Sequence, residues 1–417
     1  MGEERATTGR PYNDKSPKIA FRLRENAKFD CIASASAPRC LTFFCRGDQW
    51  SPAEKRSPPY RIDRFTQHTQ KEVRNAETRR RPQGNMQTKI LSAAETAEAG
   101  EILRRGGLVA FPTETVYGLG GNALDADAAR KIYEAKGRPS DNPLIVHLAD
   151  AGQAEQYAVT DDAFYRLAAL FMPGPITVIL PKKDCIPSAV TGGLDSVALR
   201  VPSHEVAHRM LRDAGVPVAA PSANLSGSPS PTVFAHVRAD LWGRVDALLD
   251  GGDCRFGVES TIVKMQDGVL RLLRPGAVTP EDLKKAGFCV EIDPAVTQKF
   301  EGRPECPGMK YRHYAPKSPV VILDGGDRAV YDFLRDKTHC GILCYAEDTE
   351  LLTRENSMSM GGRDDLETQA HRLFACLRAM PELDVIYARM PSKEGIGLAV
   401  FNRLIKAAGY QVIHLEN

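Results

Sequence analysis

The stretch KIYEAKGRPSDNPLIVHL, residues 131–148, is the most informative part of this 417-residue chain. Its first residues repeat apolar side chains at helical spacing, and its end, Leu144–Leu148, is a short apolar run typical of a buried strand. Lys136 and Arg138 lie in the loop between them, which two prolines stiffen. Fixed cations in a rigid loop suit a polyphosphate or a carboxylate. Compensation of the helix C-terminus by the same charges is an equally good explanation at this point.

Helices and strands alternate on both sides of this stretch, which predicts an α/β fold with a mixed sheet. The pattern Ser92-Ala-Ala-Glu95 has the form of a capping box and predicts the first helix. We expect the sheet to be complete by Leu273. Further helices are expected over 126–135, 161–171 and 205–214, and strands over 108–111, 144–148, 176–180, 197–201, 216–220, 245–249, 261–265 and 269–273.

The same periodicity predicts the domain organisation. Residues 86–293 are expected to form the larger domain. Residues 294–318 lose the periodicity and contain several prolines, so we interpret them as a linker. Residues 319–417 are expected to form a smaller α/β sandwich, with strands over 320–323, 341–345, 385–388 and 411–415 and helices over 328–337, 366–380 and 399–408.

The charge is distributed unevenly along the chain. Residues 1–85 carry 18 Lys and Arg against 10 Asp and Glu and show no sustained period. We interpret them as a disordered basic tail or as upstream sequence translated in error before Met86; a nucleic-acid-binding arm or a transit segment is the alternative. The remaining 332 residues carry 37 basic against 43 acidic residues, so they are a poor candidate for sequence-independent nucleic-acid binding.

Composition excludes two further classes of protein. No apolar stretch approaches the roughly 18 to 20 residues that cross a bilayer, and the first thirty residues alternate charges where a signal peptide needs an apolar core, so we expect a cytoplasmic protein with no membrane contact. The ten cysteines are scattered without a C-x-x-C pair, which favours free thiols over disulfides or a zinc site.

Two more loops are rich in polar groups. Residues 112–121, PTETVYGLGG, leave a strand with hydroxyls and a carboxylate before a run of glycines, which let backbone approach a ligand closely. Residues 221–231, PSANLSGSPSP, place short hydroxyls and amides after a strand and ahead of a helix, a geometry that binds anions. The chain has no Walker A lysine signature, and the G-x-G-x-x-A match from Gly118 is weak evidence for a dinucleotide.

The pentapeptide His204-Glu-Val-Ala-His208 matches the zinc-hydrolase pattern H-E-x-x-H. Pro202 and Ser203 place His204 at the cap or first turn of a helix, whereas a zincin needs both histidines within a helix that faces a cleft. We therefore expect two partly exposed helix residues and no metal site.

Five motifs occur in one order: FPTETVYGLG (111–120), KIYEAKGRPSDNPLIVHL (131–148), PSANLSG (221–227), GVESTIV (257–263) and LLRPG (272–276). Together they resemble the YrdC-like threonylcarbamoyl-AMP synthases, whose fold is a twisted mixed sheet with flanking helices. The part after Pro319 is similar to the extra domain of their longer, two-domain members. The resemblance covers about Met86–Asn417.

The resemblance implies a reaction. Such enzymes combine L-threonine, bicarbonate or carbon dioxide, and ATP to give threonylcarbamoyl-AMP and pyrophosphate, with Mg²⁺ accompanying the triphosphate. The product is the donor for modifying the adenosine beside the anticodon of tRNA, and a separate transferase machinery must accept it. A weak contact with RNA is a further implication.

The resemblance also assigns residues by motif position. The family's catalytic tetrad corresponds to Lys136, Arg138, Ser222 and Asn224. Lys310, Tyr311, His313 and Tyr314 resemble a linker segment that folds over the pocket, although packing of the second domain onto the first would also explain the two tyrosines. ATP would contact Arg138, Asn142, Ser196, Ser222, Ser230, Arg274 and Tyr314, and threonine would contact Thr115, His147, Arg200, Ala220 and Ser260.

Two other functions are alternatives to this reaction. A double-stranded RNA-binding module without catalysis is one, but the acidic balance after residue 85 argues against it. A carbamoyltransferase-like maturation factor is the other, but it would require an acylphosphatase unit and paired zinc-finger cysteines, which the sequence lacks.

Overall fold

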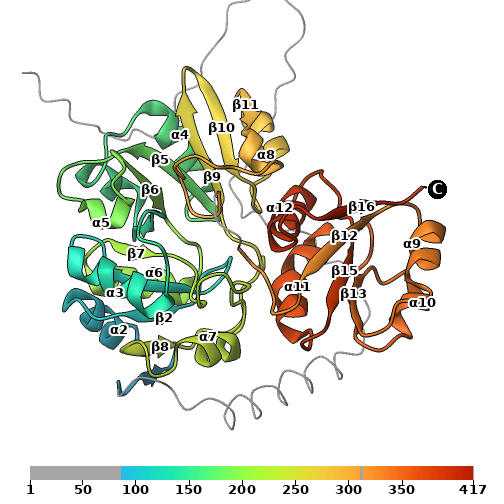
Figure 1. Ribbon diagram of the computed structural model, residues 1–417. Coiled ribbons are helices and arrows are strands. Elements are labelled where there is room, and N and C mark those ends of the chain that lie inside the picture. The colour runs from blue at the N-terminus through green and yellow to red at the C-terminus, as the bar shows by residue number, and fades with distance from the viewer. Residues whose placement is uncertain (1–85, 310–312, 417) are drawn as a thin grey trace, which may run out of the picture. The chain divides into compact units, whose positions relative to one another are not determined.

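The computed structural model describes residues 86–309 and 313–416. The expectations for residues 1–85 and for Lys310 and Tyr311 lie outside the described residues. The described chain builds two sheets, each with its own helices (Figure 1). Within this part of the chain, no helix is long and apolar enough to cross a membrane.

The first sheet is mixed, which confirms the predicted fold class. It contains parallel pairs, such as β4 with β6, and antiparallel pairs, such as β2 with β3. In sheet order its strands are β1 (Lys89–Leu91), β8 (Ala247–Leu249), β2 (Val109–Phe111), β3 (Gly118–Asn122), β7 (Val218–Ala220), β4 (Ile145–His147), β6 (Ser196–Arg200), β5 (Ile176–Pro181), β9 (Thr261–Gln266), β10 (Val269–Arg274) and β11 (Val290–Ile292).

Two expectations about this sheet were wrong. The glycine run was expected to be a loop, but it forms β3 between β2 and β7. Glycine is required there because a Cβ on Gly120 would lie 2.8 Å from Val218 Cγ1 and 2.9 Å from the Phe111 ring. The sheet also continues past Leu273, because β11 pairs in parallel with β10. A three-residue, largely exposed strand gives little periodic signal.

Helices flank this sheet. The first begins at Thr96, later than the capping-box pattern suggests: the Glu95 carboxylate accepts hydrogen bonds from the backbone N and Oγ of Ser92, but no side chain caps the helix. The helices are α2 (Thr96–Arg104), α3 (Ala126–Lys136), α4 (Asp162–Phe171), α5 (Ser188–Thr191), α6 (Glu205–Ala214), α7 (Phe234–Leu241) and α8 (Pro280–Lys285), with 3₁₀ turns at Ala151–Gln156 and Pro294–Val296.

The second sheet is parallel throughout. Its strand order is β14 (Ser357–Ser359), β13 (Cys340–Cys344), β15 (Val385–Arg389), β12 (Val320–Asp324) and β16 (Val412–His414). Alternate residues of β12 face opposite sides: Ile322 packs with α11 (Leu366–Ala379) and α12 (Gly397–Ala407), and Leu323 packs with α9 (Asp327–Leu334) and α10 (Thr349–Leu352). The predicted α/β sandwich is confirmed.

One hydrophobic core runs through both sheets. Val146 of β4 and Leu199 of β6 belong to the same buried cluster as Phe374 of α11 and Phe401 of α12. The backbones also approach closely: a Cβ on Gly257, which has φ +76°, would lie 2.5 Å from His371 Cα. Removing the second sheet would therefore expose apolar surface on the first.

The cysteines and the H-E-x-x-H pattern agree with a structural role. The seven described cysteines are free thiols, and five of them are buried. His204 is the N-cap of α6, and His208 Nε2 lies 2.6 Å from the Ala149 carbonyl oxygen. Both histidines are partly exposed, as expected.

Candidate active site

The polar loops of the first sheet converge on one cavity of about 50 Å³, which the segment between the sheets helps to close. Four of the predicted site residues, Thr115, Asn142, Ser196 and Ser260, do not line it. The predicted residues that do line it are Lys136, Arg138, His147, Arg200, Ala220, Ser222, Asn224, Ser230, Arg274 and Tyr314.

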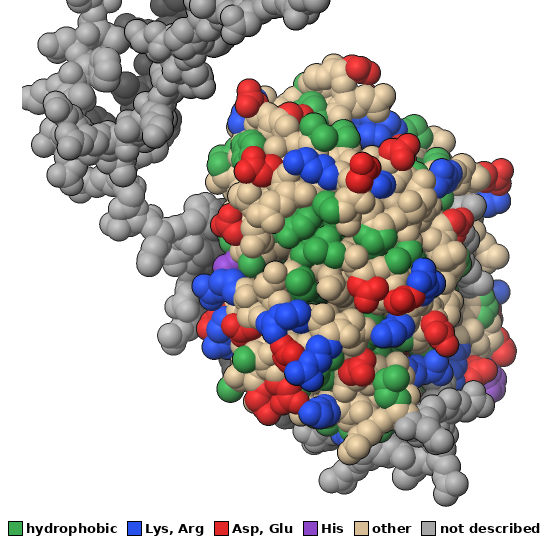
Figure 2. All heavy atoms as spheres, turned by 90° about the vertical axis from the view of Figure 1, so that its left-hand side faces the viewer, with side chains coloured by type: hydrophobic (Ala, Val, Ile, Leu, Met, Phe, Trp, Pro, Cys, Tyr) green, Lys and Arg blue, Asp and Glu red, His purple; other side chains and the backbone are tan. Residues whose placement is uncertain are grey.

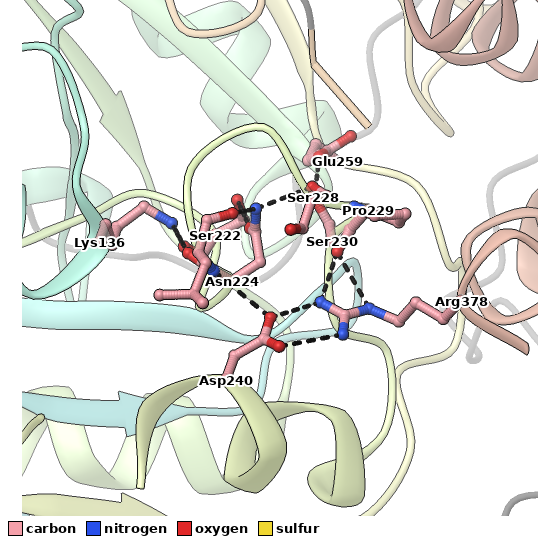
Figure 3. A network of polar contacts seen from close by, with 10 residues as sticks. Lys136, Ser222, Asn224, Ser228, Pro229, Ser230, Asp240, Glu259 and Arg378 are labelled. Atoms are coloured by element: carbon pink, nitrogen blue, oxygen red, sulfur yellow. Dashed lines mark hydrogen bonds and ion pairs between the residues drawn. The ribbon is translucent and has the colours of Figure 1, made fainter. Parts of the chain in front are cut away.

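Lys136 ends α3 and is almost fully buried. Its Nζ donates to the carbonyl oxygen of Ser222 at 2.5 Å and to that of Asn224, so it crosses from one loop to the other (Figure 3). Burial, and next the charge of Arg138, hold the pKa of Lys136 well below its usual value. A nearby anion would therefore favour uptake of a proton by this amine.

Arg138 also lines the cavity and is partly exposed. Its Nε donates to the Asn142 carbonyl at 3.3 Å, and its Nη2 donates to the Pro143 carbonyl at 3.1 Å. These bonds hold its own loop in shape. Burial lowers the pKa of Arg138 to about 10, which leaves the guanidinium charged at neutral pH.

The serine-rich loop follows β7 and is held by its own polar groups. Ser222 Oγ donates to Asn224 Oδ1 at 2.5 Å, and Asn224 Nδ2 donates to the carbonyls of Leu225 and Ser228 at 2.7 and 2.9 Å. Asn224 is therefore a support for the loop as well as a part of the cavity wall.

Glu259, which was not among the predicted site residues, is the one acid among the described lining residues. Its Oε1 accepts from Ser230 Oγ at 2.5 Å, and its Oε2 accepts from Arg403 Nε of α12 at 2.7 Å. The acid lies inside the quoted motif GVESTIV, so its position was available from the sequence. The contact with Arg403 was not, because 144 residues separate the partners.

A second contact brings α11 to the same loop. Arg378 Nη2 donates to the Pro229 carbonyl at 2.6 Å and lies 2.7 Å from Asp240 Oδ2 (Figure 3). Because Pro229 adjoins Ser230, the second sheet and its helices support the wall that carries Glu259.

The residues expected to bind threonine form a buried group. Arg200 Nη2 lies 2.7 Å from Glu114 Oε1 and donates to Thr115 Oγ1 at 3.0 Å. Thr115 therefore helps to hold the Arg200 guanidinium in place. Glu114 is the carboxylate of the motif FPTETVYGLG, and no specific role was predicted for it. Burial, and next the charge of Arg200, lower the pKa of His147 to about 3, so its imidazole is neutral. Its Nδ1 lies 3.2 Å from the Ile145 carbonyl.

Ser260, Ser196 and Asn142 lie outside the cavity wall for different reasons. Ser260 Oγ accepts from Arg274 Nη2 at 3.0 Å and so positions that arginine. Ser196 begins β6 opposite Pro181. Asn142 is buried, and its Oδ1 has no hydrogen-bond partner among the described residues.

The segment between the sheets helps to close the cavity, with lining residues both before and after positions 310–312. Arg274 Nη1 donates to the Pro307 carbonyl at 3.3 Å, and Lys406 Nζ of α12 donates to the Gly308 carbonyl. Tyr314 stacks on Phe374 at 5.1 Å between ring centroids. Tyr314 therefore both lines the cavity and packs against the second sheet's helices.

The comparisons with known proteins match this organisation. Residues 101–276 match the family model described as telomere recombination, and residues 278–409 match the model of the threonylcarbamoyl-AMP synthase C-terminal domain. Threonylcarbamoyl-AMP synthases from Pyrococcus abyssi and Bacillus subtilis are each 44% identical over 76% of this chain and 94% of their own. The chain belongs to the threonylcarbamoyl-AMP synthase family.

A solved structure supports the same membership. The crystal structure of P. abyssi Sua5 complexed with L-threonine has a TM-score of 0.73 and 41% identity, covering 79% of this chain and all of that one. Together the two family models span strands of both sheets of this chain.

Proposed function

We propose that this protein synthesises L-threonylcarbamoyladenylate from L-threonine, bicarbonate or carbon dioxide, and ATP, with release of pyrophosphate. The observation that carries the proposal is one cavity in which Lys136, Arg138 and Arg274 lie beside a buried arginine and a neutral imidazole. The three cations suit the phosphates of ATP. The buried arginine, Arg200, and the neutral imidazole of His147 suit an amino acid. Membership of the synthase family supports the same reaction.

The reaction needs no nucleophile from the protein. The threonine amine attacks carbon dioxide and loses a proton, which gives a carbamate. A carbamate oxygen then attacks the α-phosphorus of ATP, the bond from that phosphorus to the bridging oxygen breaks, and pyrophosphate leaves. The protein would contribute by orienting the two substrates, excluding water and stabilising the charge that develops on the phosphate oxygens.

Lys136, Arg138 and Arg274 are proposed to meet the phosphates. Mg²⁺ is proposed to enter as part of the substrate, held by the triphosphate oxygens. Glu259 is a poor ligand for it, because both carboxylate oxygens already accept hydrogen bonds. Ser222, Asn224, Ser230, Asn142, Ser196 and Tyr314 complete the proposed nucleotide set.

Arg200 is proposed to bind the threonine carboxylate, since its Nε is buried and has no hydrogen-bond partner among the described residues. Glu114 Oε2 is likewise buried and has no hydrogen-bond partner among the described residues. A bound amino acid would supply a carboxylate to accept a hydrogen bond from Arg200 Nε and a hydrogen-bond donor for Glu114 Oε2. His147, Thr115, Ser260 and the backbone of Ala220 complete the proposed threonine set.

Residues 294–318 are proposed to act as a lid between a catalytic domain over 86–293 and a C-terminal domain over 319–417. The cavity encloses about 50 Å³, well below the roughly 300 Å³ or more that small-molecule sites need. Pro307, Gly308 and Tyr314 line it, so ATP would have to displace them. Reclosure would then protect a mixed anhydride from water.

In the cell, the product is proposed to pass to a separate transferase that modifies tRNA next to the anticodon, in the cytoplasm. RNA binding as the main role has less support. On the face drawn in Figure 2, acidic and basic side chains are interspersed, which gives no extended basic surface on that face.

The test is synthesis by the full chain. The protein is incubated with ATP, Mg²⁺, bicarbonate and labelled threonine, and the adenylate is sought by chromatography together with pyrophosphate. We expect labelled adenylate to form only when bicarbonate is present. Pyrophosphate release that is independent of threonine, or no product at all from folded protein, would contradict the proposal.

A further inference from the structure

A second cavity lies among the second sheet's residues, at the carboxyl ends of β12, β13 and β15. It encloses about 430 Å³, which is within the range of small-molecule sites. Asp324 ends β12, Tyr345 follows β13 and Arg389 ends β15, and all three line it. In open parallel sheets, ligands bind in the crevice outside these strand ends. None of its lining residues belongs to the first cavity.

Arg389 is the unusual residue of this cavity. Its side chain is 5% exposed, its Nε lies 3.4 Å from Asp348 Oδ2, and its Nη2 donates to Asp327. Its Nη1 is shielded from solvent and has no hydrogen-bond partner among the described residues. A buried guanidinium donor without an acceptor is rare in folded proteins, so this wall is suited to a ligand oxygen.

The mouth of the cavity has the opposite character. Asp364 and Glu394 line it, are exposed, and form no ion pair with the residues that the structure describes. Lys393, between Ser392 and Glu394 in sequence, does not neutralise them, because its Nζ lies 4.8 Å from the centre of the Phe401 ring. Asp324 lies 3.0 Å from His414. The cavity therefore has an unmatched donor inside and unmatched carboxylates outside.

The charges disfavour a polyphosphate. The two arginines of the lining, Arg363 and Arg389, already share Asp327, which lies 2.6 Å from Arg363 Nη2. Asp327 is the first residue of α9, so a carboxylate already occupies the helix N-terminus where a phosphate would bind. No surplus of positive charge remains on the described lining to balance several negative charges.

We propose that this cavity binds a basic α-amino acid. The carboxylate of the ligand accepts a hydrogen bond from Arg389 Nη1, which requires a side-chain movement in the lining because that atom is shielded from solvent in this structure. Its α-ammonium and its side-chain cation pair with Asp364 and Glu394 at the mouth. A ligand with one anionic and two cationic groups matches both the internal donor and the acidic rim, and the volume accommodates its long side chain. This site is separate from the proposed synthase chemistry and does not depend on it.

The test is isothermal titration calorimetry on the full chain, with L-lysine and L-arginine as probes. In Arg389→Met we expect affinity to fall by about tenfold or more, because a buried charge-assisted bond is lost. In the double variant Asp364→Asn, Glu394→Gln we expect a fall of about fivefold. Arg335→Met is the matched control, since Arg335 pairs with Asp332 on an exposed surface outside this cavity and should leave affinity unchanged.

The rim variant keeps the test informative if Arg389→Met does not fold, because both rim residues are exposed. Arg200→Met should leave the binding of L-lysine unchanged while it impairs the first cavity, so failure of one site is distinguishable from failure of the other. No binding of either probe would overturn the proposal, as would binding that neither the rim variant nor Arg389→Met alters. Tighter binding of AMP than of L-lysine, with loss in Arg389→Met, would make this a nucleotide site and would also overturn it.

Discussion

Arg403 and Glu259 form a buried ion pair between α12 and the wall of the first cavity, with Nε 2.7 Å from Oε2. Burial alone would raise the pKa of Glu259, but the charges of Arg403 and Arg274 outweigh it and hold that pKa below its ordinary value. A residue of the second sheet's helices therefore neutralises an acid in the cavity proposed for ATP.

Replacing Arg403 tests this relationship. In Arg403→Met the carboxylate of Glu259 remains buried without its main partner, which should cost about 3 to 5 kcal/mol of the free energy of unfolding. We also expect KM for ATP to rise more than kcat falls, because the acid would repel the triphosphate. Glu259→Gln combined with Arg403→Met should recover part of both losses, and equal KM values in the single and double variants would contradict the assignment.

The same variant should weaken a pH dependence of stability. In the wild type, the lowered pKa of Glu259 contributes stability that is present above the ordinary carboxyl pKa and is lost as pH falls through the folded value. Without Arg403, the pKa of Glu259 should rise, because burial is then opposed mainly by the charge of Arg274 and by the hydrogen bond from Ser230. The gain in Tm as pH rises from about 3 to about 6 should therefore be smaller in Arg403→Met than in wild type. The double variant, which also carries Glu259→Gln, should lack this contribution altogether.

Lys136 should take up a proton when ATP binds. Its pKa is held well below its usual value by burial and by Arg138, and phosphate oxygens would raise it. Calorimetry of ATP binding in buffers of different ionisation enthalpy measures this uptake. Lys136→Met should abolish it, whereas Arg138→Met should only reduce it, because loss of the Arg138 charge raises the pKa of Lys136 in the free protein. Identical uptake in Lys136→Met and wild type would show that another group titrates.

The two loop cations should be needed for turnover. Lys136→Ala and Arg138→Ala are each expected to reduce the rate of adenylate formation about 100-fold or more. Lys136→Ala should also lower stability by about 1 to 3 kcal/mol, because it leaves the carbonyls of Ser222 and Asn224 without their donor. Thermal unfolding separates the two effects. Near wild-type pyrophosphate release in either variant would contradict the site.

Substrate selection should depend on the threonine hydroxyl. Serine should be used with an efficiency lower by about 10- to 200-fold, since one methyl group in a pocket contributes roughly 1 to 3 kcal/mol. Valine should be a much poorer substrate if a buried polar group such as the neutral His147 reads the hydroxyl. Comparison of kcat/KM for the three amino acids decides this, and equal use of valine would remove that role from His147.

The segment between the sheets should respond to substrates. Limited proteolysis between Glu305 and Lys317 is expected to slow when ATP and threonine are present, because the proposed lid would close over them. Cutting the chain before Pro307 should weaken adenylate output. It should also destabilise the first sheet's domain, because Arg403 and the shared core are lost. Equal cleavage rates with and without ligands would show that the segment is only a packing element.

Local sequence signals predicted the framework of the fold and part of the candidate site. The helix that ends at Lys136 and the strand that ends at His147 were expected within a residue or two of their observed bounds, because both have regular apolar patterns. The strand β3 was missed, because glycines carry no periodic signal and only the close approach of Phe111 and Val218 explains them. Roles of individual residues came from the family resemblance and remain proposals.

The sequence alone determined the α/β class, the order of the motifs and the family, because these depend on spacing along the chain. Only the tertiary structure decided which distant residues support them. Glu259 meets Arg403 across 144 residues, and Asp240 meets Arg378 across 138. The unmatched Nη1 of Arg389 likewise appears only after β12, β13 and β15 come together. Such pairings depend on how whole elements pack, and no local pattern of residues encodes them.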